Sequence, residues 1–306
     1  MDKIYDLAII GAGPAGMTAG IYAKRAGLET IMFENSAPGG KLVKTFEIDN
    51  WPGESRVSGV DLALKMYEHT TSLEIETEFV GIKKINNDII KTLETEDGRT
   101  FKAKAVILAT GTIENKMEIP NEDRLTGHGV SFCAVCDGAF YKKKEVVVIG
   151  GGNSALEEAV YLTQFATKVT IVIRRDVFRA DKVAQEHALD HPKISVIRHT
   201  VPIAVVGEDH VTAIRLKDLI TNEEYDYPTD GIFPYIGATA STTSVAHLNV
   251  LDPLGYMIVN EKMASKVPGL YGAGDVCVKP LRQIVTAVSD GAVAAQMAFL
   301  YIQSIK

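Results

Sequence analysis

Two of the three cysteines lie close together, Cys133 and Cys136, and Asp137 follows them directly. A disulfide between such near neighbours would constrain little of the unfolded chain, so stability is a poor reason for it. Redox exchange is a better reason, because a C-x-x-C pair can carry a thiol of low pKa that attacks other disulfides. The spacing therefore predicts a redox-active cysteine pair.

Two other interpretations of the pair stay open at this point, a structural zinc site and incidental packing. A structural zinc needs four ligands. The chain has no second cysteine pair, and His187 and His191 begin about fifty residues downstream, far from zinc-finger spacing. We therefore expect no metal. The third cysteine, Cys277, has no partner in spacing and is expected to be a small core residue.

The elements that could position such chemistry begin near the N-terminus. A short apolar run at residues 7–10 predicts a strand, and the turn at residues 11–16 (G-A-G-P-A-G) leads into a helix-like segment. A second strand at residues 30–33 ends in Glu34, which lies 21 positions past Gly13. This order is typical of a dinucleotide-binding unit rather than of a plain tight turn. The glycines let the backbone approach a pyrophosphate, and Glu34 can accept both hydroxyls of an unphosphorylated ribose.

The same pattern occurs a second time, directly after the cysteine pair. Residues 146–149 predict a strand, and residues 150–155 form the G-x-G-x-x-A version of the turn. Residues 156–162 keep a helical period, and residues 169–173 predict the following strand. The chain is therefore expected to contain two dinucleotide-binding units.

The two units differ in charge at the position that would contact the ribose. The second unit has Arg174 there, 22 positions past Gly152, and Arg175 and Arg179 follow. An acid repels a 2′-phosphate, whereas a guanidinium cluster can bind one through paired hydrogen bonds. The first unit is therefore expected to bind the adenosine of FAD, and the second to bind NADPH. A solvated charged turn is the alternative interpretation of the arginines.

The remaining pattern predicts the rest of an α/β chain. We expect a second glycine loop at residues 38–41, a helix at 57–71, antiparallel strands at 79–101, a central parallel strand at 105–111 and short strands and turns from 181 to 235. An apolar-glycine-acid turn follows at 270–275, and a buried helix is expected at 281–303.

Composition limits the possible functions. The 306 residues suggest two domains, and 46% hydrophobic and 23% charged residues are ordinary for a soluble globular protein. The net charge of −7, without a basic tract, argues against nucleic acid as a partner. No apolar run approaches the roughly 18 residues of a membrane span, so no membrane is expected. Three cysteines form no disulfide framework, so a reducing, cytoplasmic setting fits best.

Six motifs together carry a resemblance to a known family. In chain order they are G-x-G-x-x-G, A-T-G, C-x-x-C-D-G, G-G-G-x-S-A-x-E-E-A, R-R-D-x-F-R-A and G-D-V. This order and spacing resemble the low-molecular-weight thioredoxin reductases over essentially the whole chain. The resemblance implies two Rossmann-like dinucleotide-binding domains with three-layer ββα architecture. An FAD domain (1–112 and 245–306) would be interrupted by an NADPH domain (113–244) that carries the cysteines. It also implies a homodimer and a thioredoxin-like partner.

The resemblance assigns roles to individual residues. Cys136 would face the flavin, Cys133 would attack the protein substrate, and Asp137 would be the acid–base group. Residues matching NADPH-side positions are Gly150, Gly152, Asn153, Ser154, Ala155, Arg174, Arg175 and Arg179. Residues matching flavin-side positions are Gly11, Gly13, Pro14, Ala15, Gly16, Glu34, Asn35, Gly39, Gly40, Lys41, Leu42, Asn50, Ala109, Thr110, Gly111, Gly274, Asp275, Arg282, Gln283 and Ile284.

The chain departs from the family pattern at three places. Lys41 stands where the family usually has Gln, Ile173 where it usually has His, and residues 237–241 where it usually has G-x-x-P-N. The expected reaction passes electrons from NADPH through FAD and the Cys133–Cys136 disulfide to thioredoxin. The alternatives are a flavin reductase with a ferredoxin- or quinone-linked acceptor, an FAD-dependent dithiol oxidase, and a redox-sensing binding protein.

Overall fold

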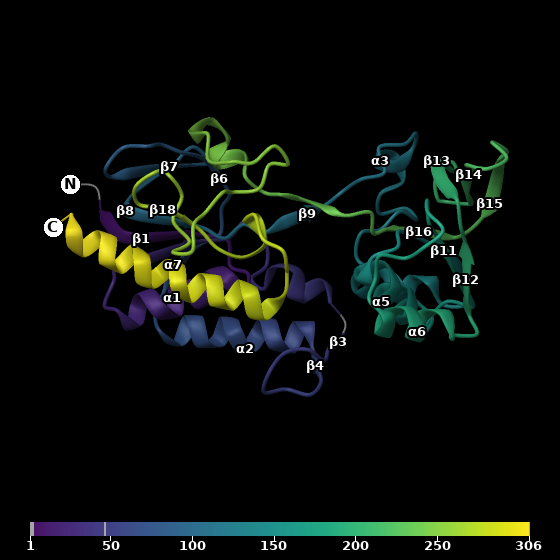
Figure 1. Ribbon diagram of the computed structural model, residues 1–306, viewed down its shortest axis with the longest axis horizontal. Coiled ribbons are helices and arrows are strands. Elements are labelled where there is room, and N and C mark those ends of the chain that lie inside the picture. Colours follow the sequence, from purple (N-terminus) through teal and green to yellow (C-terminus); the bar gives the residue numbers. More distant parts are fainter. Residues whose placement is uncertain (1–2, 46, 306) are drawn as a thin grey trace. The chain divides into compact units, whose positions relative to one another are not determined.

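The computed structural model describes residues 3–45 and 47–305 (Figure 1). The chain forms two compact units. The discontinuous unit comprises Met1–Ile113 and Thr239–Lys306, and the inserted unit comprises Glu114–Ala238. The two segments that connect them, β9 (Thr112–Glu114) and β17 (Ala238–Ala240), pair with each other as a two-stranded sheet.

The discontinuous unit is built on one mixed sheet with the strand order β5-β2-β1-β8-β7-β6, in which β18 also pairs with β8. The strands β5, β2, β1, β8 and β18 run parallel, and β6 and β7 extend the sheet in antiparallel pairing. The strands are β1 (Ile4–Ile10), β2 (Thr30–Phe33), β5 (Glu76–Glu78), β6 (Ile82–Ile85), β7 (Lys91–Thr95), β8 (Thr100–Leu108) and β18 (Leu270–Gly272).

Alternate residues of β1 pack into two different cores. Leu7 and Ile9 pack with apolar residues of the helices α1 and α7, whereas Ala8 and Ile10 pack with residues of β6, β7 and the segment that precedes β18. This alternation is expected of a strand buried on both faces. Figure 1 shows α1 and α7 side by side on one face of the sheet. The other elements of this unit are α1 (Pro14–Arg25), η1 (Gly40–Lys44), β3 (Glu47–Ile48), β4 (Val57–Ser58), α2 (Gly59–Ser72), η3 (Thr243–Leu248), η4 (Gly274–Val276) and α7 (Ile284–Ser304).

The inserted unit repeats this layering more clearly. Its parallel sheet has the order β12-β11-β10-β16, and a separate antiparallel sheet has the order β13-β14-β15. In β10, Val146 and Val148 pack against the helices, and Val147 and Ile149 pack toward the antiparallel sheet. The prediction of three-layer ββα architecture is therefore confirmed.

The inserted unit contains these elements: α3 (Glu122–Leu125), α4 (Ala134–Asp137), η2 (Gly138–Tyr141), β10 (Glu145–Ile149), α5 (Asn153–Leu162), β11 (Lys168–Val172), α6 (Lys182–Leu189), β12 (Ile194–Ile197), β13 (Thr200–Val206), β14 (Ala213–Asp218), β15 (Glu224–Pro228) and β16 (Gly231–Pro234).

Two expectations from the sequence need correction. The stretch after Asp181 contains more than strands and turns, because it begins with helix α6. The Asp181 side chain caps this helix by accepting a hydrogen bond from Ala184 N at 2.9 Å. Helix α7 is also long and apolar enough, by length and composition, to cross a membrane, although no such run was expected. Its inner face packs against α1 in the core, as predicted for a buried C-terminal helix.

Candidate active site

The first glycine turn lies between β1 and the N-terminus of α1. Gly11 has φ +103°, and a Cβ there would lie 2.4 Å from the Ala109 carbonyl oxygen, so only glycine fits. At Gly13 a Cβ would meet only Gly40 Cα, at 3.9 Å. The first glycine thus permits the tight turn, and the second leaves the helix N-terminus open to a ligand, as a dinucleotide-binding turn requires.

Glu34 lies beside this turn, directly after β2. Its carboxylate accepts hydrogen bonds from Ala12 N at 2.7 Å and from Ser36 N at 2.9 Å. The second glycine loop joins the same place, because Gly39 N donates to Ala12 O at 2.8 Å. The structure therefore brings together the predicted ribose acid and both glycine loops, although Ala12 and Gly39 lie 27 positions apart in sequence.

Charged residues from two segments interact electrostatically with Asp275, which follows the turn after β18. Burial raises the pKa of Asp275, and the positive charges of Lys41, Lys279 and Arg282 oppose that rise. Predicted flavin-side residues of the second glycine loop and of the C-terminal segment therefore lie close enough to interact electrostatically. The predicted Thr110 lies in the loop after β8, and its hydroxyl donates to Ser241 O at 2.6 Å.

The N-terminus of α7 brings two more predicted residues together. Gln283 is the N-cap and forms a capping box with Thr286. Asn50 Nδ2 donates to Gln283 Oε1 at 3.2 Å, across 233 positions of sequence. The guanidinium of Arg282 lies 4.2 Å from the centre of the Tyr256 ring. These contacts fix the entry of the chain into α7.

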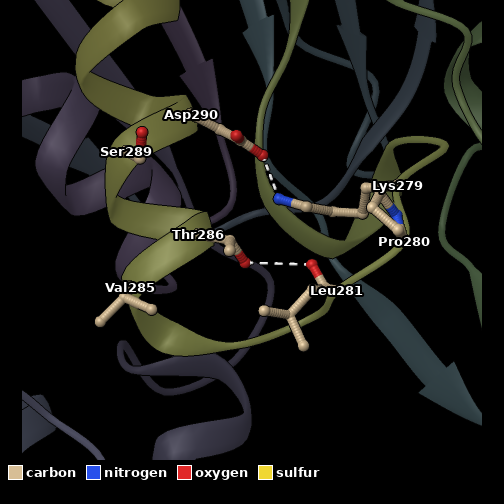
Figure 2. A pocket seen from close by; sticks show the side chains of 7 residues that line it. All are labelled: Lys279, Pro280, Leu281, Val285, Thr286, Ser289 and Asp290. Atoms are coloured by element: carbon tan, nitrogen blue, oxygen red, sulfur yellow. Dashed lines mark hydrogen bonds and ion pairs between the residues drawn. The ribbon is translucent and has the colours of Figure 1, made fainter.

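A cavity of about 340 Å³ opens beside this helix start (Figure 2). In Figure 2 the Lys279 ammonium meets the Asp290 carboxylate, and Thr286 Oγ1 donates to Leu281 O at 3.1 Å. The Lys279 and Asp290 side chains are only 10% and 14% exposed. Asp290 also accepts from Gly274 N at 3.0 Å, so this pair holds the turn that leads to Asp275. Sequence reasoning missed the pair, since nothing in the motifs marks it. The residues that line the cavity are 279–281, 285, 286, 289 and 290.

The second glycine turn has the same geometry in the inserted unit. Gly150 has φ +139°, and a Cβ there would lie 2.2 Å from the Tyr235 carbonyl oxygen. A Cβ at Gly152 would meet nothing within 4 Å. Ala155, in the first turn of α5, is fully buried, and Asn153 Oδ1 accepts a hydrogen bond from Asp181 N at 3.0 Å. This turn therefore has the same open N-terminus as the first.

The three arginines lie in the loop after β11 and are exposed. Arg179 N donates to Gly151 O at 2.7 Å, so the loop folds back onto the glycine turn. Within the described parts of the chain, none of Arg174, Arg175 and Arg179 forms an ion pair. The loop therefore presents three guanidinium groups beside the second turn.

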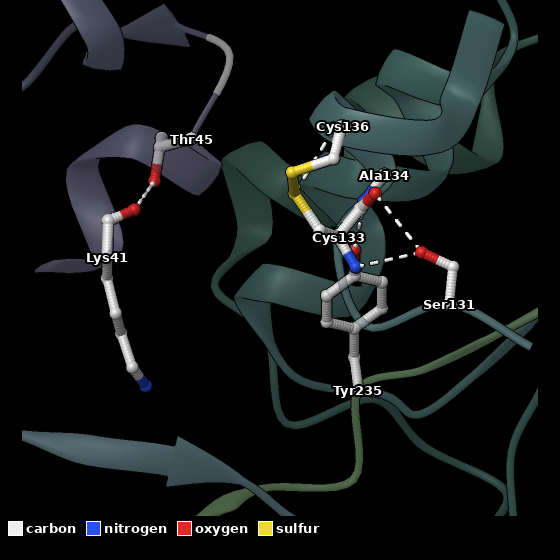
Figure 3. The surroundings of a disulfide bond; sticks show 7 residues. All are labelled: Lys41, Thr45, Ser131, Cys133, Ala134, Cys136 and Tyr235. Carbon is white, nitrogen blue, oxygen red and sulfur yellow. Dashed lines mark hydrogen bonds between the residues drawn. A yellow bond between two sulfur atoms is a disulfide. The ribbon is translucent and has the colours of Figure 1, made fainter. Parts of the chain in front are cut away.

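Cys133 and Cys136 form a disulfide with a Cα–Cα distance of 5.3 Å at the start of α4 (Figure 3). The expected disulfide between these two cysteines is therefore present. Cys136 is exposed and Cys133 is partly buried. Cys133 is the N-cap of α4, and its Sγ accepts from Cys136 N at 3.1 Å. Its own N–H donates to Ser131 Oγ at 3.1 Å.

Two residues of the inserted unit, Tyr235 and Glu158, were not among the site residues predicted from the sequence. The Tyr235 hydroxyl accepts from Ala134 N at 3.1 Å (Figure 3). Glu158 on α5 has a buried Oε2 atom without a hydrogen-bond partner, and burial, with the nearby Glu157 charge, raises its pKa to about 8. The letters E-E-A of the fourth motif include Glu158, but nothing local in the sequence shows that its carboxylate is buried.

Cys277 lies outside this chemistry. It is 1% exposed in the core of the discontinuous unit, and burial raises the pKa of its thiol to about 12. A thiol with so high a pKa is a poor nucleophile. The expectation of a small core residue is confirmed.

The chain matches known proteins over nearly its whole length. A family model described as pyridine nucleotide-disulphide oxidoreductase matches residues 5–291. A thioredoxin reductase from Listeria innocua is 44% identical over 307 residues, covering 100% of this chain and 96% of the relative. One from Bacillus subtilis is 43% identical over 306 residues, covering 100% and 97%. The crystal structure of Lactococcus lactis thioredoxin reductase has a TM-score of 0.95 and 41% identity, covering 98% of this chain and 99% of that one.

The chain therefore belongs to the pyridine nucleotide-disulphide oxidoreductase family. It is an oxidoreductase, and the resemblance to thioredoxin reductases seen in the motif order is confirmed along its full length. Family membership implies a flavin and a nicotinamide nucleotide as cofactors. The two open glycine turns fit two such dinucleotides, because each has space at the second glycine that a side chain would fill.

Proposed function

We propose that this protein is an NADPH-dependent thioredoxin reductase. In this reaction NADPH supplies two electrons, which pass through FAD and the Cys133–Cys136 disulfide to the disulfide of thioredoxin or a thioredoxin-like protein. The observation that carries the proposal is the disulfide itself, joined by Tyr235 to the second dinucleotide turn within one unit. The relatives named thioredoxin reductase support this choice of substrate.

FAD is proposed at the first turn and NADPH at the second. Glu34 supports FAD because its carboxylate can accept ribose hydroxyls and would repel a 2′-phosphate. Arg174, Arg175 and Arg179 support NADPH because their exposed guanidinium groups can bind a 2′-phosphate. The sequence-predicted residues around each turn are proposed to bind the corresponding cofactor. Residues 1–112 and 245–306 are proposed as the FAD domain, and residues 113–244 as the NADPH domain.

When bound, a flavin takes a hydride from a nicotinamide and passes both electrons on to a disulfide. The two electrons would open the Cys133–Cys136 bond to two thiolates, one of which takes up a proton, and the N–H of Cys136 would stabilise the Cys133 thiolate. Cys133 Sγ attacks one sulfur of the substrate disulfide, and the other substrate sulfur leaves as a thiolate. Cys136 Sγ next attacks Cys133 Sγ, the internal disulfide forms again, and the second substrate thiolate is released. Asp137 is proposed to deliver the protons.

The environment and assembly are also proposed from the resemblance. We expect a homodimer in the cytoplasm, acting on a thioredoxin-like protein. Light scattering of the purified protein measures the oligomeric state directly. A mass of one chain would contradict the homodimer without affecting the proposed reaction.

The test replaces Cys136 by Ser in the flavin-loaded protein. The variant should keep its flavin spectrum and still be reduced by NADPH, but reduction of thioredoxin should fall to background, because the dithiol route is cut. Direct reduction of ferricyanide, which takes electrons from the flavin, should remain. Cys277→Ser is the matched control and should keep near wild-type turnover, since that thiol is buried in the core.

Three results would overturn the proposal. Thioredoxin reduction by Cys136→Ser at near wild-type rate would show a route that avoids the disulfide. Wild-type protein that reduces no thioredoxin in a panel, but consumes oxygen with a dithiol substrate, would be a dithiol oxidase. Turnover with ferredoxin or a quinone alone would indicate the flavin reductase alternative.

A further inference from the structure

Tyr235 connects the second glycine turn to the redox disulfide. It directly follows β16, and its N–H donates to Ile149 O at 2.7 Å at the end of β10. Its carbonyl oxygen occupies the space where Gly150 lacks a side chain. Its side chain reaches α4, where the hydroxyl accepts from Ala134 N at 3.1 Å (Figure 3). One residue is thus fixed by its backbone at the turn and by its side chain at the cysteine pair.

The hydroxyl keeps its proton in this position. Burial raises the pKa of Tyr235, and the nearby charges of Glu158, Glu114 and Asp137 raise it further, against the smaller opposite effect of the Ala134 hydrogen bond. The hydroxyl is therefore a neutral, permanent acceptor for the Ala134 N–H. Ala134 itself is fully buried, so water cannot replace that acceptor.

We propose that Tyr235 is a positioning residue that stabilises the disulfide form of the Cys133–Cys136 pair over its dithiol form and so makes the dithiol a stronger reductant. The role in electron donation rests on the proposed function. The effect on the cysteine equilibrium does not, because it follows from contacts within the inserted unit.

The physical reason lies in the acceptors available to Ala134 N–H in the two states. In the disulfide form Cys133 Sγ is a neutral, weak acceptor that already takes the N–H of Cys136. Tyr235 is then the acceptor that Ala134 N–H depends on. In the dithiol form a Cys133 thiolate at the N-cap would place a full negative charge close to Ala134 N, and this charge stabilises the N–H dipole even without a direct hydrogen bond. Loss of the Tyr235 hydroxyl therefore leaves a buried N–H unsatisfied mainly in the disulfide form.

The test is Tyr235→Phe, which keeps the ring and removes only the hydroxyl. Wild-type and variant protein are equilibrated in dithiothreitol redox buffers, and Cys133 and Cys136 are scored as thiol or disulfide by alkylation and peptide mass spectrometry. We expect the equilibrium of the variant to shift about tenfold toward the dithiol, which corresponds to a midpoint about 30 mV more positive. Flavin reduction by NADPH should stay near the wild-type rate.

Tyr227→Phe is the matched control. Its hydroxyl contacts Lys168 and Thr170 in the same unit, at 2.9 and 3.0 Å, without a bond to α4. The thiol–disulfide equilibrium constant of the Tyr227→Phe variant should stay within about twofold of the wild-type value. A Tyr235→Phe midpoint equal to wild type, or shifted to more negative values, overturns the inference. A wild-type protein that fails to reduce thioredoxin contradicts only the proposed function, because the cysteine equilibrium is measured without NADPH or thioredoxin.

Discussion

Replacing Glu158 by Gln should stabilise the inserted unit at alkaline pH and leave its stability nearly unchanged in acid. Glu158 lies on α5 with a buried Oε2 atom that no donor satisfies. Burial raises the pKa of this carboxyl from 4.5 to about 8, with the negative charge of Glu157 as the second cause. Gln has nearly the same shape and never carries a charge, so the substitution isolates the cost of ionising the group.

The sign follows from proton binding. Below pH 4.5 the carboxyl is protonated in both the folded and the unfolded chain, so it adds no pH dependence. Between pH 4.5 and about 8 the unfolded chain loses this proton while the folded chain keeps it, so the free energy of unfolding falls as pH rises. One pKa unit corresponds to about 1.36 kcal/mol, which sets a ceiling of about 5 kcal/mol above pH 8. Local relaxation and water entry reduce such costs, so we expect about 2–4 kcal/mol.

The assay is hydrogen exchange of the α5 amides at matched conditions from pH 5 to pH 9, corrected for intrinsic exchange rates. The only tryptophan, Trp51, lies in the discontinuous unit, so its fluorescence does not report on α5. Glu186→Gln on α6 is the control, because Glu186 is an exposed carboxyl of the same unit that does not contribute to the raised pKa of Glu158. If Glu158→Gln changes protection equally at pH 5 and pH 9, Glu158 is not a carboxyl kept neutral by burial, and the reasoning fails.

Two further predictions concern the inserted unit. Replacing Arg174 and Arg175 together by Ala removes two charged contacts of roughly 1.5–3 kcal/mol each, so kcat/KM for NADPH should fall on the order of 10²–10⁴-fold. The NADH value should change little and the flavin spectrum should persist; an unchanged NADPH/NADH preference would mean a solvated turn. Asp181→Ala removes the cap of α6 and should cost about 1 kcal/mol. Exchange of the α6 amides measures this loss, and Asp190→Ala at the other end of α6 serves as the control; equal protection in both variants would refute the capping role.

The two turns and their flanking strands were predictable because their signals are local. Gly11, which must adopt a positive φ, is separated by only one residue from Gly13, the glycine that a ligand must approach. Apolar runs on both sides mark strands buried on both faces. Helix α6 was missed because only Ala184 and Ala188 are buried on it, so its apolar face is too narrow to give a clear helical period. Its cap, Asp181, was the available signal.

The surroundings of the redox pair could not be predicted in the same way. Tyr235 lies 101 positions from Ala134, and its contact depends on where β16 ends in the parallel sheet. The Asn50–Gln283 contact is separated by 233 positions. Long-range pairs of this kind carry no spacing signal in a single sequence. The cysteine spacing, by contrast, identified the disulfide because the three-position separation itself allows the bond to close.

The two units also explain why Tyr235 is in a position to influence the disulfide. In the discontinuous unit Ile10 pairs with Leu108, the last residue of β8. The residue that follows β8, Ala109, places its carbonyl against Gly11. In the inserted unit Ile149 pairs with Pro234, and the next residue, Tyr235, places its carbonyl against Gly150. Ala109 and Tyr235 therefore occupy equivalent positions. The contact with the turn is made by the backbone at both positions, so the side chain can differ between the units. At the first turn it is the methyl group of Ala109. At the second it is the phenol of Tyr235, which reaches the amide beside Cys133.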